Sequence, residues 1–193
     1  MSEIKDIVLI LANIALTLVA VHYFILFAFM SFRSGSAVPL PSTRIACNRL
    51  EPLLIKRFSG RKFTFLDLGC GSGRIVLFVA QRFPLARSIG IEHNPYIRLL
   101  FNIKRRILGL KNASAISADI FKADIGAVRP DAVYLYLSRA ANAKITGKLK
   151  RELPSKTLII SNKFKLAGMR LVNTDKFVNF ASGPLYIYSN ERA

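Results

Sequence analysis

Cysteine and histidine, the side chains that most often build cross-links and metal sites, are nearly missing from this chain of 193 residues. The two cysteines are Cys47 and Cys70, and the two histidines are His22 and His93. Neither pair has a spacing typical of a disulfide framework or of a zinc site. The sequence therefore predicts no metal centre, and Cys70 is expected to pack as a small apolar residue.

Acidic residues are scarce as well. The chain has 11 Asp and Glu against 29 Lys and Arg, a formal net charge of +18. Residues 1–30 contain one lysine and two acids, a net of −1, which leaves +19 on the remainder. A surface this positive attracts anionic lipid headgroups or nucleic acid. We therefore expect an anionic partner.

Charge is absent altogether from Ile7–Met30. As a helix these 24 residues would span roughly 36 Å, at about 1.5 Å per residue, enough to cross a hydrocarbon core of about 30 Å. A cleaved signal peptide is the alternative, with a small-residue site at Gly35-Ser36-Ala37. The run is too long for a signal core, however, and the residues before it are not basic. We expect one uncleaved N-terminal transmembrane helix.

The residues that flank this run predict its orientation. Glu3, Lys5 and Asp6 stand before it. Up to residue 62, the residues after it include one acid, Glu51, and seven basic side chains: Arg33, Arg44, Arg49, Lys56, Arg57, Arg61 and Lys62. The positive-inside rule places the N-terminus outside and the rest in the cytoplasm. The sequence thus predicts a single-pass protein of the cell membrane.

The chain accordingly divides into three parts. Residues 1–32 form the anchor, and residues 33–41 form a linker rich in glycine, serine and proline. Residues 42–193 form the remaining part, and a chain of this length is expected to hold one folded domain.

The stretch Phe63–Gly73, FTFLDLGCGSG, predicts a buried strand, a glycine-rich turn and the start of a helix. Glycines at 69, 71 and 73 can take positive φ and let a ligand approach the backbone closely. The following helix would direct its free N–H groups and its positive dipole end at that ligand. The order D-x-G-x-G-x-G, with Asp67 two residues before the first glycine, differs from the GxGxxG of dinucleotide-binding turns.

Two more acids follow predicted strands. The second strand, Ser88–Glu92, ends in an acid 25 residues after Asp67. In α/β nucleotide-binding folds an acid at this position hydrogen-bonds ribose hydroxyls, which is the role we expect for Glu92. The third strand, Ala113–Ser117, is followed by Asp119.

The remaining pattern predicts further strands at Asp131–Leu137, Thr157–Ser161, Lys176–Phe180 and Leu185–Tyr188. The last two would form an antiparallel hairpin, and no helix is evident before them. Tyr136 and Ser138 stand at and just after the end of the predicted fourth strand, and ligands of open α/β sheets bind outside the carboxyl ends of the strands. Tyr136 or Ser138 is therefore the candidate for the acceptor pocket.

Together the run from Asp67 to Gly73 and the two later acids resemble the class I S-adenosylmethionine-dependent methyltransferases. The resemblance implies a Rossmann-like α/β sheet and S-adenosylmethionine as cofactor. It implies that Asp119 accepts from the adenine amino group, while Ile120 or Phe121 covers the ring. The candidate cofactor-binding residues are Asp67, Gly69, Cys70, Gly71, Gly73, Glu92, His93, Asp119, Ile120 and Phe121.

A narrower resemblance rests on Val38-Pro39-Leu40-Pro41, on DLGCGSGRIV from Asp67, and on the closing strand Leu185-Tyr186-Ile187-Tyr188. These look like the ATP synthase c-subunit lysine methyltransferases and the small archaeal protein-lysine methyltransferases. The resemblance implies N-methylation of lysine, here in a membrane-associated protein. A positive surround and a dry pocket would both lower the pKa of an acceptor lysine, so no dedicated base is required.

Three alternatives stay open: methylation of a lipid or quinone, methylation of RNA, and non-catalytic binding of S-adenosylmethionine. Nucleic acid is the weaker partner, because an anionic membrane already accounts for the charge. Tyr136-Leu137-Ser138-Arg139 stands where methyltransferases of planar amines carry an acidic or Asn-Pro-Pro-aromatic motif. This difference argues against methylation of adenine N6 or glutamine N5.

Overall fold

A computed structural model describes residues 2–33, 44–175 and 183–190. The chain forms two compact units, Met1–Leu40 and Pro41–Ala193. The first contains helix α1 (Ser2–Arg33), whose side chains between Lys5 and Tyr23 are exposed. That stretch is long and apolar enough to cross a membrane. Its transmembrane character stays a prediction.

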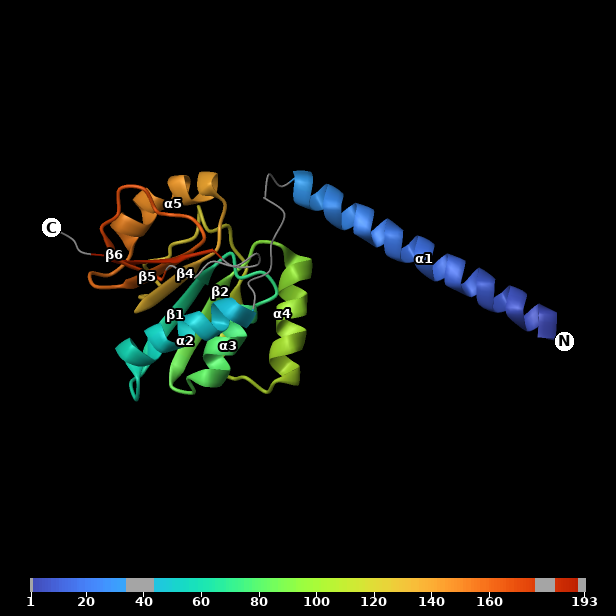
Figure 1. Ribbon diagram of the computed structural model, residues 1–193, viewed down its shortest axis with the longest axis horizontal. Coiled ribbons are helices and arrows are strands. Elements are labelled where there is room, and N and C mark those ends of the chain that lie inside the picture. The colour runs from blue at the N-terminus through green and yellow to red at the C-terminus, as the bar shows by residue number, and fades with distance from the viewer. Residues whose placement is uncertain (1, 34–43, 176–182, 191–193) are drawn as a thin grey trace. The chain divides into compact units, whose positions relative to one another are not determined.

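The second unit is a sheet with helices on both faces (Figure 1). Its described strands have the order β3-β2-β1-β4-β5-β7-β6, in which β1 to β5 are parallel and β7 is antiparallel to both neighbours. The strands are β1 (Phe63–Leu68), β2 (Ala86–Ile91), β3 (Ala113–Ile116), β4 (Ala132–Leu135), β5 (Leu158–Asn162), β6 (Leu171–Asp175) and β7 (Leu185–Ser189). The helices are α2 (Arg44–Phe58), α3 (Arg74–Arg82), α4 (Pro95–Ile107) and α5 (Arg139–Glu152).

Alternation along the central strands places one core on each face of the sheet. Phe65 of β1 and Tyr134 of β4 belong to the cluster that α2 covers. Leu66, which follows Phe65, and Val133, which precedes Tyr134, belong to the cluster on the other face, which α5 covers. Strands of a parallel sheet are buried on both faces, which explains why the sequences of β1 and β4 are nearly continuous runs of apolar residues.

The register brings the carboxyl ends of the central strands to one edge. Asp67 lies opposite Gly90 of β2 and Tyr134 of β4, and Leu68 lies opposite Ile91 and Leu135. In sheets of this kind, ligands bind outside the carboxyl ends, at the point where the strand order reverses. Here that point lies between β1 and β4.

The predicted strand Lys176–Phe180 lies outside the described residues, and the described β6 is Leu171–Asp175. Strand β6 pairs antiparallel to β7. Side chains in β6 are exposed or half-buried, so the strand signal of β6 in the sequence is weak. The predicted lack of a helix between β5 and β6 is confirmed, since the described residues 163–170 contain none.

Candidate active site

The glycine turn between β1 and α3 uses each glycine differently. All three have positive φ, at 78° for Gly69, 56° for Gly71 and 83° for Gly73. A Cβ added at Gly73 would stand 2.0 Å from the Phe101 ring, whereas one added at Gly71 would meet nothing within 4 Å. Gly73 is therefore needed for packing against α4, and Gly71 leaves its backbone open to a ligand.

The turn is held against the end of β2. The backbone N–H groups of Gly69 and Cys70 both donate to the Ile91 carbonyl at 3.0 Å. The Cys70 side chain is buried against Gly90, where an added Cβ would lie 2.3 Å from its Sγ. Burial, followed by the nearby Asp67 and Glu92 carboxyls, raises the pKa of the Cys70 thiol far above its usual range. Cys70 thus packs as a small neutral side chain, as predicted.

Glu92 lies directly after β2 and joins the turn to the next helix. Its Oε2 accepts from the Gly71 N–H at 3.0 Å, and its Oε1 accepts from the Asn94 N–H at 2.8 Å. The side chain of Glu92 is largely buried, while that of neighbouring His93 is half exposed, with its Nδ1 3.5 Å from Glu92 Oε1. A carboxylate has about four lone-pair sites, so Glu92 keeps acceptor capacity for a ribose diol.

Asp67 is a buried carboxyl at the end of β1. Burial, followed by the charge of Glu92, raises the pKa of Asp67 from 3.8 to about 8. A buried carboxyl in this position is neutral at pH 7 unless a positive charge comes close, because a cation favours the ionised form. Asp67 can therefore ionise and pair with a cationic ligand that binds at the turn.

Asp119 follows β3 and shapes its own turn. Its Oδ1 accepts from the Phe121 N–H at 2.9 Å. Ile120 and Phe121 are partly buried against the core on the α5 side, and Lys144 Nζ lies 4.3 Å from the centroid of the Phe121 ring. Lys144 of α5 thus occupies one side of that ring. Since a carboxylate offers several acceptor sites, Asp119 retains acceptor capacity for an adenine amino group.

The two predicted acceptor-side residues have different surroundings. Ser138 is the N-cap of α5, and its hydroxyl oxygen accepts from the Ala141 N–H at 3.2 Å. Tyr136 is half-buried against the α2 core, and burial raises the pKa of its phenol. A capping hydroxyl and a phenol that keeps its proton are both poor general bases.

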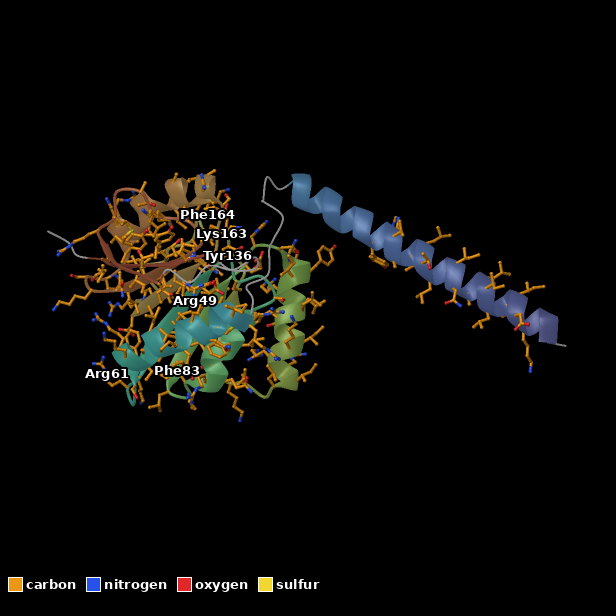
Figure 2. The ribbon with its side chains drawn as sticks, viewed as in Figure 1. Arg49, Arg61, Phe83, Tyr136, Lys163 and Phe164 are labelled. Carbon is orange, nitrogen blue, oxygen red and sulfur yellow. The ribbon has the colours of Figure 1, made fainter. Side chains whose placement is uncertain are left out.

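A basic pocket of about 370 Å³ is formed by residues that come after the ends of β4 and β5, and the sequence did not predict it. Its lining residues, among those that the structure describes, are Arg139, Ala143, Lys163, Phe164, Lys165, Ala167 and Tyr186, with no acid. Arg139 Cζ lies 5.4 Å and Lys163 Nζ 5.7 Å from the centroid of the Phe164 ring. Lys165 Nζ lies 5.6 Å from the centroid of the Tyr186 ring. Figure 2 labels Lys163, Phe164 and Tyr136.

A buried hydrogen-bond network fixes the loop that forms this pocket. Asn142 Nδ2 donates to Ser161 Oγ at 3.2 Å and to the Phe164 carbonyl at 3.1 Å. Ser161 Oγ donates to the same carbonyl at 2.6 Å. The loop also holds Lys163 at a φ of 71°, which non-glycine residues rarely adopt. The Lys163–Lys165 run was visible in the sequence, but its convergence with α5 and β7 was not.

Comparison with known proteins agrees with this geometry. Residues 67–173, more than half of the chain, match the model of the ANTKMT methyltransferase domain. A protein-lysine N-methyltransferase of Saccharolobus islandicus (strain REY15A) is 33% identical over 105 residues, which are 53% of this chain and 63% of that protein. The matched stretch thus covers less than two thirds of that curated relative.

Solved structures show the same fold. An RNA methyltransferase from Salinibacter ruber, in complex with S-adenosyl-L-homocysteine, has a TM-score of 0.69 and 25% identity, and covers 81% of this chain and 95% of its own. A precorrin-6y C5,15-methyltransferase from Geobacter metallireducens GS-15 has a TM-score of 0.57 at 17% identity, covering 80% and 91%.

These findings confirm the predicted Rossmann-like methyltransferase sheet and S-adenosylmethionine as its cofactor. The glycine turn, Glu92 and Asp119 lie where such a cofactor is expected, at the carboxyl ends of β1, β2 and β3. The chain belongs to the ANTKMT methyltransferase domain family.

Proposed function

We propose that this protein is a membrane-attached methyltransferase that N-methylates a lysine of a membrane-associated protein. The main support for lysine as the methyl acceptor is the 33% identity with a protein-lysine N-methyltransferase. The open backbone at Gly71 and the part-satisfied carboxylate of Glu92 support a cofactor at the turn.

The residues at the carboxyl ends of β1, β2 and β3 would each contribute a separate interaction. Glu92 accepts from the ribose hydroxyls, Asp119 accepts from the adenine amino group, and Gly71 lets the amino-acid end approach the backbone. The bound cofactor supplies an electrophilic methyl group on a sulfonium. Asp67 ionises beside this cationic ligand, because a positive charge favours the carboxylate.

The acceptor side needs a neutral lysine amine. Among the residues that the structure describes, the pocket beside β5 is lined by three cations and no acid, which disfavours a protonated ammonium nearby. A lysine that enters from solvent therefore loses its proton without a dedicated base. Alignment of the amine with the methyl group supplies most of the acceleration.

Attachment to the membrane is the second part of the proposal. The uncharged Ile7–Met30 run would act as a single span, with the basic remainder in the cytoplasm. A tether of about ten residues reaches no more than roughly 35 Å. Substrates in the same membrane therefore gain a high effective concentration.

The test is to incubate the full-length protein with whole membranes and cofactor labelled on its methyl group, and then to separate protein, lipid and RNA. Label should enter protein, and mass spectrometry should find it on lysine. Label only in the lipid fraction would replace the lysine acceptor by a lipid or quinone. Label in no fraction would favour a non-catalytic binding protein.

RNA is the second candidate acceptor. The Salinibacter ruber RNA methyltransferase covers 81% of this chain, and the net charge of +18 suits a polyanion. The same experiment decides between them, because label in the RNA fraction that disappears on ribonuclease treatment would establish this candidate instead.

A further inference from the structure

Helix α4 presents an apolar stripe to solvent. Five large apolar side chains recur along it at the i, i+3, i+4, i+7 and i+11 spacing of one helix face, and Leu108 follows at its end. They are Tyr96, Leu99, Leu100, Ile103 and Ile107, between 45% and 79% exposed. Phe101 is the one residue of α4 that is buried.

The usual arrangement is therefore inverted in this helix. The apolar stripe of a helix that covers a sheet normally faces that sheet. In α4 the inward position belongs to Phe101, which fills the space left by Gly73. An exposed, contiguous apolar surface on a soluble domain marks an interaction site.

Positive charge accompanies the stripe. Lys104, Arg106 and Lys111 are exposed beside it, and the chain between His93 and Ala118 contains no acid. A helix with apolar residues on one face and basic residues at its flanks lies in the plane of an anionic bilayer surface, with the apolar face in the headgroup region.

We propose that this outward face of α4 docks on an anionic lipid surface. This inference rests on the proposed attachment to a membrane: α4 would make a second contact with the membrane, in addition to the N-terminal span. A second copy of the chain is a poorer occupant, because a symmetric pairing of α4 would bring two basic flanks together. Lipid phosphates neutralise those flanks, and acyl chains cover the stripe.

Docking of α4 would act directly on the cofactor turn. Phe101 packs against Gly73, and Lys104 Nζ donates to Ser72 Oγ at 2.8 Å. A helix held at the lipid surface would therefore hold the glycine turn close to that surface. The arrangement suits an acceptor that emerges from the bilayer only by a short loop.

The absence of tryptophan makes a direct test available. The full-length protein with Ile107→Trp is reconstituted into nanodiscs of phosphatidylcholine, with or without phosphatidylglycerol, and some lipid chains are brominated. Tryptophan emission should shift to the blue and lose at least half of its intensity to the bromines in the anionic discs. A second probe on the same face, Leu100→Trp, should behave alike.

The matched control is Val172→Trp on β6, whose wild-type side chain is 59% exposed and lies away from α4 in the sequence. It should keep the emission of an exposed indole in both lipids. Adding Arg106→Gln and Lys111→Gln to Ile107→Trp should reduce the quenching in anionic discs, and so should high salt.

Three results would overturn the inference. Equal quenching of the α4 probes and the control would remove α4 as the contact. Equal quenching in neutral and anionic discs would remove the role of the basic flanks. A blue shift in detergent that grows with protein concentration would assign the face to a second copy. None of these readouts needs methyl transfer, so they do not depend on the identity of the acceptor.

Discussion

The two halves of the carboxyl edge differ in charge and in construction. Around β1, β2 and β3 the site consists of glycine backbone and three acids, Asp67, Glu92 and Asp119. Around β4 and β5 it consists of cations and aromatic rings from α5, the loop after β5, and β7. The acidic half suits a cationic cofactor with hydroxyl and amino donors, and the basic half suits a neutral amine.

The difference teaches how one domain with a large positive charge can hold a cationic ligand. The chain has few acids, but Asp67, Glu92 and Asp119 lie buried or half-buried at the carboxyl edge of the sheet. The low dielectric there strengthens their attraction for a cation. The three cations of the pocket, Arg139, Lys163 and Lys165, are exposed, so solvent screens them and their individual effects should be smaller.

The largest expected effect comes from Gly73→Ala. Its Cβ would stand 2.0 Å from the Phe101 ring and the residue would keep a φ of 83°, so overpacking and backbone strain should together cost about 2–4 kcal/mol of stability. Chemical denaturation of the full-length protein in mild detergent measures the loss.

Gly71→Ala is its matched control. The φ of 56° again disfavours alanine, yet the Cβ meets nothing within 4 Å, so only about 1–2 kcal/mol of stability should be lost. Cofactor affinity should fall more than stability does, because the new methyl group stands where the ligand approaches. Equal stability losses in the two variants would contradict the division of roles between these glycines.

Next in size is Glu92→Ala. Loss of a charged acceptor from the cofactor should weaken binding by about 1.5–3 kcal/mol in calorimetry. Arg87→Ala is the control, since Arg87 is an exposed residue near the amino end of β2 and its loss should change the affinity by only a few tenths of a kcal/mol. If both variants bound like the wild type, the acidic half would not hold the ribose.

The pH dependence of cofactor binding should follow Asp67. Its pKa of about 8 means that a cationic ligand must displace a proton below that pH, so affinity should rise with pH up to about 8 and then level off. The change is at most about tenfold per pH unit, and Asp67→Asn should abolish it. Calorimetry in two buffers of different ionisation enthalpy detects the released proton.

For folding the same pKa has the opposite consequence. The folded-state pKa of about 8 exceeds the ordinary 3.8, so the folded protein binds more protons between these values. Stability should therefore fall as the pH rises from about 4 to about 8, and the fall should be shallower in Asp67→Asn. An unchanged pH profile in that variant would remove Asp67 as its source.

The smallest effect is expected in the basic half. Lys163→Met should raise the pKa of an acceptor lysine and so move the rising, acid-side limb of the pH–activity profile to higher pH by about 1 unit or less. Lys62→Met, an exposed lysine before β1 and outside the pocket, is the control of equal charge change. A profile that moved equally in both variants would point to net charge rather than to the pocket.

The features that the sequence predicted correctly are local ones. Strand β1, the glycine turn and the acid after β2 each depend on residues close together in the chain. Neighbouring side chains and the glycine conformations determine them. The pocket beside β5 and the close packing of Cys70 on Gly90 join residues far apart, and no local pattern encodes them.

The sequence by itself determined the order of elements, the cofactor turn and the positive charge, because periodicity, glycine placement and composition are properties of the chain. Only the tertiary structure decided which way the α4 stripe faces. A periodic pattern shows that a helix has an apolar side but not what covers it. Here Phe101 takes the inward position because Gly73 leaves room for its ring, and the stripe from Tyr96 to Ile107 faces outward.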